Sequence, residues 1–332
     1  MKILIVRFSS IGDIVLTSPV VRCIRKQIPS AEIHYLTKSS YKEIIEHNPH
    51  ITTRHFLNNN LRDIISSLKK EKFDFIVDLH NNLRSLKLKW SLRRRGNSFN
   101  KINLEKWLYV NLKWNMMPVA HIVDRYLETV KDLGVKNDGE GLDYFISPKD
   151  VIKIEELPLT HLHGYIAIAI GTQHATKKYP LEKLKRLVSL LHYPIILLGG
   201  KEDFESGEAI RNQDKFKVFN ACGKFSLNQS ASIIKLSQLV ITHDTGMMHV
   251  AAAFKKKIIS LWGNTVPEFG MYPYFGDEEK YHQDYFKSRV VEVAGLSCRP
   301  CSKLGFQKCP RGHFNCMNKI NEEEIAAVVR LM

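Results

Sequence analysis

Short apolar runs alternate with helix-like segments along this chain, and this alternation limits the fold more than any other feature. In the first half, the runs predicted to be strands are residues 2–8 (KILIVRF), 31–37 (AEIHYLT), 55–58 (HFLN) and 73–80 (FDFIVDLH). Segments ending near residue 27 and spanning 41–47 and 61–70 are predicted helices. Such alternation is typical of a parallel sheet with helices on both faces.

The same pattern starts again after a polar stretch, residues 147–164, that contains two prolines and reads as a linker. The predicted strands of the second half are 165–171 (YIAIAIG), 194–200 (PIILLGG), 217–222 (KVFNAC), 239–244 (LVITHD) and 257–263 (KIISLWG). A chain of 332 residues is too long for one typical core. We therefore expect two doubly wound α/β domains, residues 1–150 and 164–332, facing each other across a cleft at the C-terminal ends of their sheets.

The composition excludes several classes of protein. Apolar residues make up 44% and charged residues 25%, as in folded soluble proteins. With no run of 18 apolar residues and no signal-peptide pattern before the first strand, we expect a cytoplasmic protein without a membrane span. Neither half carries G-x-G-x-x-G after a strand or a G-x-x-x-x-G-K-[ST] loop, which argues against a nicotinamide dehydrogenase and a P-loop kinase or ATPase.

The net charge of +15 is concentrated in one stretch of the first half. Residues 84–113 contain nine basic residues and one acid, Glu105, with tryptophan, tyrosine and phenylalanine interleaved. Such a stretch suits an anionic membrane surface, a phosphorylated lipid or a nucleic acid, and a solvated basic helix is an equally good interpretation. The candidate contacts are Arg84, Arg93, Arg94 and Arg95.

The turn after the first strand carries an acid, Asp13, where many α/β proteins place a phosphate-binding glycine loop. A helix N-terminus attracts anions, so a carboxylate at that position competes with a bound phosphate. Asp13 is then either a helix cap or part of a turn with another task.

A phosphate cradle is predicted in the second half, where “VITHDTGMMHVAAAF” passes from a strand through a turn directly into a helix. The amides of Thr245, Gly246 and Met247 are expected to point outward at the helix start, with the Thr245 hydroxyl as a further donor. N-capping is the simpler role for Asp244 and Thr245, and a hydrogen-bonded, half-buried position is the simpler one for His249.

Two further loops follow strands of the second half. In “GTQHATKKYP”, Thr172 ends a strand, and one of Lys177 and Lys178 has the length to reach a diphosphate at the Thr245–Gly246 turn, unless both are solvated. In “GGKED”, Glu202 is placed to accept hydrogen bonds from a ribose or to pair with the helix dipole.

Four cysteines lie close together near the C-terminus in the order C-x2-C-x7-C-x6-C, namely Cys298, Cys301, Cys309 and Cys316, with His313 nearby. In a cytosolic chain such spacing suggests zinc more than disulfides, although it matches no common zinc finger and buried free thiols remain an alternative. We expect a structural role; Cys23 and Cys222 are expected in the core.

Together, “KILIVRFSSIGDIVLTSPVVRCIRKQIP”, “TKKYP”, “GGKED” and “HDTGMMHVAAAF” resemble glycosyltransferase family 9, the heptosyltransferases of lipopolysaccharide inner-core synthesis. The resemblance covers nearly the whole chain, and “CPRGHFNCM” is similar to the tail of some members. It implies the GT-B fold of two Rossmann-like domains, and an inverting transfer of heptose from ADP-heptose without a catalytic metal or a cofactor.

The resemblance also implies roles for individual residues. Asp13 matches the catalytic base, and Lys177 matches the lysine that contacts the donor diphosphate. The other matched donor-binding positions are Thr172, Glu202 at the adenosine ribose, Asp244, Thr245, Gly246, Met247 and His249. Gln173 departs from the hydroxyl residue that some members carry beside Thr172.

The implied partners are a nucleotide-sugar donor, an anionic lipid A–core acceptor and the cytoplasmic face of the inner membrane, with no nucleic acid. One alternative is the same fold acting on another nucleotide sugar. An alternative of another class is a nucleic-acid or membrane-binding module without turnover, which the basic stretch at 84–113 would suit.

Overall fold

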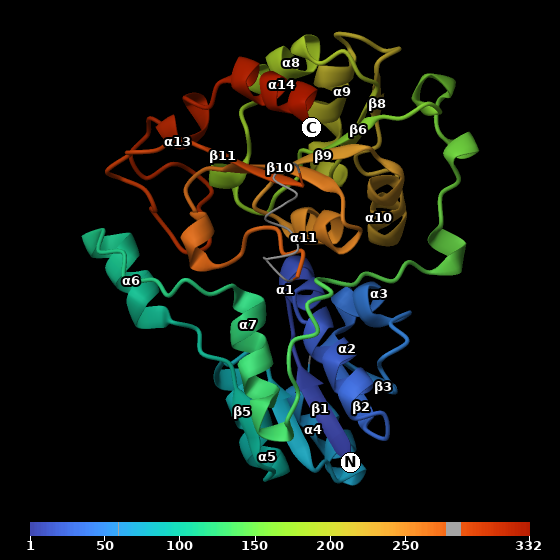
Figure 1. Ribbon diagram of the computed structural model, residues 1–332, viewed down its shortest axis with the longest axis vertical. Helices are drawn as coiled ribbons and strands as arrows, with labels where there is room; N and C mark the ends of the chain where they lie inside the picture. Colours follow the sequence, from blue (N-terminus) through green and yellow to red (C-terminus); the bar gives the residue numbers. More distant parts are fainter. Residues whose placement is uncertain (59, 277–286) are drawn as a thin grey trace.

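The computed structural model describes residues 1–58, 60–276 and 287–332, which form two α/β domains stacked end to end (Figure 1). Each domain contains one sheet, and every strand pairing between neighbours is parallel. The prediction of two doubly wound domains is therefore confirmed. Within the described ranges, every helix is too short or too polar to cross a bilayer.

The first sheet has the strand order β3-β2-β1-β4-β5. Its central strands are buried apolar runs, as parallel strands covered on both faces must be. The strands are β1 (Lys2–Val6), β2 (Glu32–Lys38), β3 (Thr53–Leu57), β4 (Phe75–Asp78) and β5 (Gly96–Ser98).

Helices and short 3₁₀ turns connect and cover this sheet. Polar side chains start several of them: Asn60 accepts from the Arg62 amide, and Asn82 from the amides of Arg84 and Ser85. The elements are α1 (Ile11–Val15), α2 (Ser18–Gln27), η1 (Ser39–Tyr41), α3 (Lys42–Ile45), α4 (Leu61–Glu71), α5 (Leu83–Leu92), α6 (Asn103–Leu112), α7 (Ile122–Leu127) and η2 (Glu128–Leu133).

The second sheet has the strand order β11-β10-β9-β6-β7-β8. When the strands are numbered within this domain alone, their order is the one found in dinucleotide-binding sheets. The direction in which successive strands are added to the sheet reverses between β6 and β9. The strands are β6 (Ile166–Ala169), β7 (Ile195–Leu198), β8 (Val218–Asn220), β9 (Leu239–His243), β10 (Lys257–Trp262) and β11 (Ser288–Glu292).

The remaining elements belong to the second domain and its link to the first. The predicted linker consists of three short 3₁₀ turns. The elements are η3 (Pro148–Asp150), η4 (Ile154–Glu156), η5 (Leu159–His161), η6 (Ala175–Lys177), α8 (Leu181–Leu190), η7 (Lys201–Asp203), α9 (Phe204–Arg211), α10 (Leu227–Leu236), α11 (Gly246–Ala253), η8 (Pro267–Phe269), α13 (Asn315–Asn318) and α14 (Glu322–Leu331).

Several boundaries differ from the prediction because side chains turn the backbone early. The predicted strand 73–80 ends at Asp78, since the Asp78 carboxylate accepts from the amides of His80 and Asn81 at 3.0 and 2.8 Å. The helical segment that ends near residue 27 divides into α1 and α2. Pro19, at the start of α2, has no backbone N–H to continue the helical hydrogen bonds. Strand β9 ends at His243, whereas the predicted strand extends one residue further, to Asp244.

The domains meet where α1 of the first packs against α11 of the second (Figure 1). Two glycines permit this approach. A Cβ on Gly12 would lie 3.2 Å from the Gly246 Cα, and a Cβ on Gly246 would lie 2.7 Å from the Ile11 Cγ2. The turns after β1 and β9 are thereby brought face to face.

Candidate active site at the domain junction

Asp13 lies in the first turn of α1 and is bound through both of its oxygens. Oδ2 accepts from the Ser10 amide at 3.1 Å and from the Ser10 hydroxyl at 2.8 Å, which is the capping role weighed above. Oδ1 forms an ion pair with Arg7 Nη2 at 2.7 Å. The carboxylate is therefore more than a cap, because a cation from the end of the strand also fixes it.

Arg7 is held rigidly by the first domain. Only 7% of its surface is exposed. Nε donates to the Ser9 carbonyl at 2.7 Å, and Nη1 donates to the Leu79 carbonyl and to the Tyr126 hydroxyl. Burial by itself raises the pKa of Asp13, but the Arg7 charge and the Ser10 hydrogen bonds outweigh it and leave that pKa below its usual value. Asp13 is thus ionised at neutral pH and able to accept a proton.

The N-terminus of α11 has no side-chain cap. Thr245 occupies the N-cap position, but its side chain makes no capping hydrogen bond, and its hydroxyl lies 3.4 Å from that of Thr242. Since the first amides of a helix have no intrahelical partner, Gly246 and Met247 present free donors with the helix dipole behind them. The simple N-capping interpretation of this turn is therefore not supported.

Lys177 reaches this turn and Lys178 does not. Lys177 Nζ lies 2.6 Å from the Asp244 Oδ2, which also accepts from the Thr265 hydroxyl at 2.8 Å. Lys178 pairs instead with Asp203, a carboxylate that is 1% exposed and also holds the Gly200 amide. Of the two adjacent lysines, Lys177 is the one placed beside the cradle.

The other predicted donor-binding residues lie around the same edge of the second sheet. Thr172 follows β6, and its hydroxyl accepts from the His174 amide at 3.4 Å. Glu202 is exposed in η7, beyond the end of β7. β6 and β9 flank the point where the winding reverses, which is where open α/β sheets bind ligands.

His249 is fully buried, contrary to the half-buried, hydrogen-bonded position considered above. Among the residues that the structure describes, its Nδ1 has no hydrogen-bond partner, and burial lowers the pKa of the ring to about 4, so the ring is neutral. Its Cδ2 would lie 2.6 Å from a Cβ on Gly12. The ring therefore packs against the turn that carries Asp13.

Two residues that the sequence analysis did not single out complete the site. Arg7 is the one charged residue in the apolar run 3–8, a signal that could have marked it. Thr265 follows β10 and fixes Asp244 from the far side, and nothing local in the sequence points to that contact.

The tail cysteines are free thiols that lie partly exposed or buried. Cys298 Sγ is 3.9 Å from His313 Nε2, and Cys301 Sγ donates to the Cys298 carbonyl at 2.9 Å. In the part of the chain that the structure describes, no three histidine, cysteine or acidic side chains are grouped to hold a metal ion. The arrangement therefore does not show the predicted zinc ligand set, and the structural role of the tail stays a prediction.

The basic–aromatic segment, residues 84–114, forms α5, β5, α6 and their connections. Arg84, Arg93, Arg94 and Arg95 are all exposed. Since α5 runs back from the end of β4 to the start of β5, the last three lie at the sheet edge opposite Asp13. These three arginines therefore lie apart from Asp13.

Comparisons with known proteins identify the family and support the fold. A family model described as glycosyltransferase family 9 (heptosyltransferase) matches residues 61–282. The lipopolysaccharide heptosyltransferase 1 of Campylobacter coli is 27% identical over 360 residues, covering 99% of this chain and 98% of that protein. A glycosyltransferase family 9 structure from Veillonella parvula is 22% identical, with a TM-score of 0.77 over 99% of this chain and 96% of that chain. The Escherichia coli ADP-heptose lipopolysaccharide heptosyltransferase II is 18% identical, with a TM-score of 0.73 over 100% and 98%.

Proposed function

Since this chain belongs to glycosyltransferase family 9 and has its GT-B fold, we propose that it transfers a heptose from ADP-heptose to a lipopolysaccharide inner-core acceptor. The transfer inverts the configuration at the anomeric carbon and uses no catalytic metal. The observation that carries the proposal is the meeting of an ionised Asp13 with the uncapped start of α11 across the domain junction.

The second domain binds the donor in this proposal. The diphosphate lies on the amides of Gly246 and Met247 and the Thr245 hydroxyl, and Lys177 turns from Asp244 toward it. These groups stabilise the negative charge that grows on the departing ADP. Thr172 adds a hydroxyl contact and Glu202 accepts from the ribose.

The first domain supplies the base. Asp13 takes the proton of the acceptor hydroxyl as its oxygen bonds to the anomeric carbon, and the bond from that carbon to the β-phosphate oxygen breaks. The electron pair of the broken bond leaves with ADP. Domain movement at the α1–α11 contact admits the donor and then returns the carboxylate to it.

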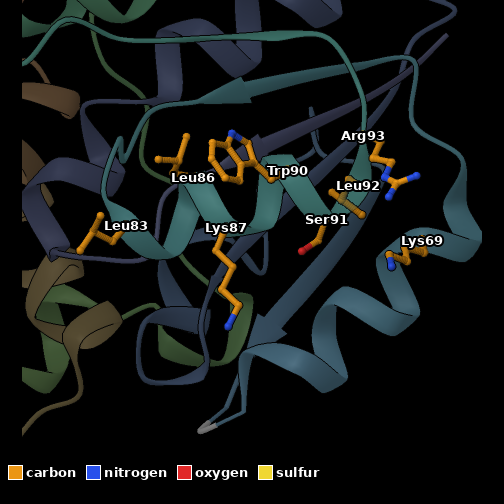
Figure 2. Close-up of a pocket in the computed structure, with 8 residues that line it drawn as sticks. All are labelled: Lys69, Leu83, Leu86, Lys87, Trp90, Ser91, Leu92 and Arg93. Atoms are coloured by element: carbon orange, nitrogen blue, oxygen red, sulfur yellow. The ribbon is translucent and has the colours of Figure 1, made fainter.

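The acceptor is anionic and lipid-linked in this proposal, and the basic–aromatic segment docks the enzyme on the cytoplasmic face of the inner membrane. A groove of 830 Å³ lies along α5 and is completed by Lys69 of α4 (Figure 2). On α5, the apolar side chains of Leu83 and Trp90 are 85% and 74% exposed, and Lys87 and Arg93 line the same groove. Exposed aromatics beside cations match the interface of an anionic bilayer.

A ligand comparison tests the proposed reaction. ADP-heptose, other nucleotide sugars and oligonucleotides are added separately, and the melting temperature is measured. A ligand present at 100 times its Kd stabilises by about 2.7 kcal/mol. ADP-heptose is expected to stabilise most and to be consumed with a core acceptor. Stabilisation by another nucleotide sugar, or by oligonucleotides alone, would identify one of the two alternatives instead.

Membrane docking is tested with vesicles that contain anionic phospholipid. Neutralising Arg93, Arg94 and Arg95 to glutamine is expected to weaken vesicle binding, and binding of the wild type is expected to fall as salt rises. The control neutralises three exposed cations elsewhere, Lys149, Lys215 and Arg330. Equal binding by the two triple variants would refute a docking role for α5.

A further inference from the structure

A segment of the cysteine-rich tail, residues 299–307, binds two loops at the C-terminal edge of the second sheet. This clasp segment lies between β11 and α13 (Figure 1). One loop follows β6 and carries Lys177, and the other follows β10 and carries Thr265. These two residues hold Asp244, whose Oδ2 accepts from Lys177 Nζ at 2.6 Å and from the Thr265 hydroxyl at 2.8 Å. The proposed function assigns no task to the clasp segment.

The clasp segment is joined to the first of these loops through Thr176. The Thr176 hydroxyl donates to the Phe306 carbonyl at 3.1 Å and accepts from the Phe306 amide at 2.8 Å. The Thr176 amide donates to the same carbonyl at 3.1 Å. Because Thr176 is 2% exposed, these hydrogen bonds are shielded from water. The residue directly before Lys177 is therefore fixed to the tail.

A glycine permits the tail to approach this loop closely. Gly305 has a φ of +130°, and a Cβ at this position would lie 2.6 Å from the Cβ of His174. Both the backbone conformation and the available space therefore favour glycine. The Ser302 hydroxyl accepts from the amides of Leu304 and Gly305 at 3.0 and 3.1 Å, and these hydrogen bonds stabilise the turn that precedes Phe306.

The clasp segment is joined to the second loop through Arg299. Arg299 Nη2 donates to the Thr265 carbonyl at 2.8 Å, and Nε donates to the Gly263 carbonyl at 2.6 Å. Nη2 also lies 2.6 Å from a carboxylate oxygen of Glu292, which balances the charge of this largely buried guanidinium. The backbone of Thr265 is thus fixed by the tail, while its hydroxyl binds Asp244.

We propose that the clasp segment is a positioning element of the donor site, which fixes Lys177 and Thr265 on Asp244 and so sets where the Lys177 ammonium meets the donor diphosphate. This inference rests on the proposed function and deepens it. A lysine carries its charge on a flexible four-carbon stem, so the position of that charge depends on the backbone from which the stem starts. A shift of about 1 Å in a group that positions a substrate can cost about 10²-fold in rate.

Substitution of Thr176 tests this positioning. Thr176→Val keeps the shape of the side chain and removes both hydroxyl hydrogen bonds to Phe306. Losing a hydrogen bond to a charged group weakens an affinity by roughly ten- to a hundredfold. Because Lys177 is displaced and not removed, we expect the Kd for ADP to rise roughly tenfold, at the low end of that range. Thr176→Ser retains the hydroxyl and is expected to keep wild-type affinity.

Ser232→Ala is the matched control, because the Ser232 hydroxyl joins two distant segments in the same way. It accepts from the Ile152 amide at 2.9 Å and donates to the Ile152 carbonyl at 3.4 Å, and Ser232 is also 2% exposed. We expect Ser232→Ala to lower the melting temperature about as much as Thr176→Val does, and to leave the Kd for ADP unchanged.

Coupling to Lys177 distinguishes positioning from a general loss of structure. The Kd for ADP is measured by calorimetry for wild type, Thr176→Val, Lys177→Ala and the double variant. If Thr176 acts through Lys177, Thr176→Val has no effect on the Kd once residue 177 is alanine. An equal loss of affinity with and without Lys177 would overturn the inference.

Acetylation of lysines by acetic anhydride measures the position of Lys177 without ADP. The Lys177 side chain is 14% exposed where it pairs with Asp244, so it is expected to react slowly, and the exposed Lys215 serves as an internal reference. Thr176→Val is expected to raise the rate at Lys177 several-fold, whereas Ser232→Ala is expected to leave it unchanged.

Arg299→Lys is the second variant, and it releases the other loop. It keeps a positive charge facing Glu292 but lacks the planar fork that binds the carbonyls of Gly263 and Thr265. It is also expected to raise the acetylation rate at Lys177. Wild-type rates at Lys177 in both variants would overturn the inference, whether or not ADP binds. Absence of ADP binding by the wild type would instead refute the proposed donor site, and acetylation would still decide the inference.

Discussion

Replacing Asp13 by asparagine separates proton abstraction from the shape of the turn. Asparagine keeps an oxygen that can accept from the Ser10 amide, as Oδ2 of Asp13 does at 3.1 Å, but it cannot take a proton. Removing a general base costs about 10²–10⁴ in rate, which corresponds to roughly 3–5 kcal/mol of barrier. We expect kcat to fall by that factor while the Kd for ADP stays unchanged.

The structure predicts a loss of stability as well. Arg7 loses its charged partner but keeps the Ser9 carbonyl, the Leu79 carbonyl and the Tyr126 hydroxyl as acceptors. Removing one member of a buried ion pair costs about 3–5 kcal/mol, and the remaining acceptors place Asp13→Asn at the lower end. At about 2–4 °C per kcal/mol for a domain of this size, the melting temperature falls by roughly 6–12 °C.

The sign of the pH dependence follows from the lowered pKa of Asp13. The Asp13 carboxylate makes its full contribution to the free energy of unfolding above pH 3.8, the pKa of this group in the unfolded chain. That contribution is lost as the pH falls through the lower pKa of the folded protein. The stability difference between wild type and Asp13→Asn is therefore full at pH 7 and shrinks in acid.

The assay compares transfer rate, ADP affinity and melting temperature in three proteins. Ser10→Ala is the control, because it removes the 2.8 Å hydroxyl contact and keeps the carboxylate and its pairing with Arg7. It is expected to lose about 1 kcal/mol of stability and little rate. Turnover of Asp13→Asn within a few-fold of wild type would show that Asp13 is only a cap and that another group is the base.

The remaining predictions concern three cations. Lys177→Ala is expected to weaken ADP binding and slow transfer, whereas Lys178→Ala mainly lowers the melting temperature, because its partner is the buried Asp203; calorimetry and thermal unfolding distinguish the two. Arg7→Met removes the charge that lowers the pKa of Asp13, so burial becomes the dominant influence and that pKa rises. The acidic limb of the pH profile of kcat/KM is then expected to move to higher pH, and a limb at the wild-type pH would contradict this.

The fold could be predicted from the sequence because the alternation of apolar runs and helical segments is repeated along the chain. The central strands are buried apolar runs, and a helical segment or turn separates each strand from the next, so an error in one element leaves the architecture unchanged. Boundaries are less predictable because they depend on single side-chain contacts. Asp78 ends β4 by binding the next turn, although the apolar pattern continues past it.

Several residues of the site that the sequence indicated lie in the turn or at the helix start that follows a strand. Asp13 comes after β1, and Asp244 and Thr245 come after β9, so strand prediction alone places them at the edges of the two sheets. Sequence cannot choose between Lys177 and Lys178, because their partners, Asp244 and Asp203, lie 67 and 25 positions away.

The placement of an acid after the first strand follows from the two helix starts that meet at the junction. At α1, Asp13 supplies the negative charge that a helix N-terminus attracts, and it also neutralises Arg7. At α11, Thr245 makes no capping bond, so that N-terminus keeps its free amides and its attraction for an anion. Gly12 and Gly246 allow these two ends to touch. In the proposed reaction, the phosphate on the second domain therefore lies opposite the carboxylate. For that reaction, a glycine loop at α1 would attract phosphate to both walls and would leave no base to face the acceptor.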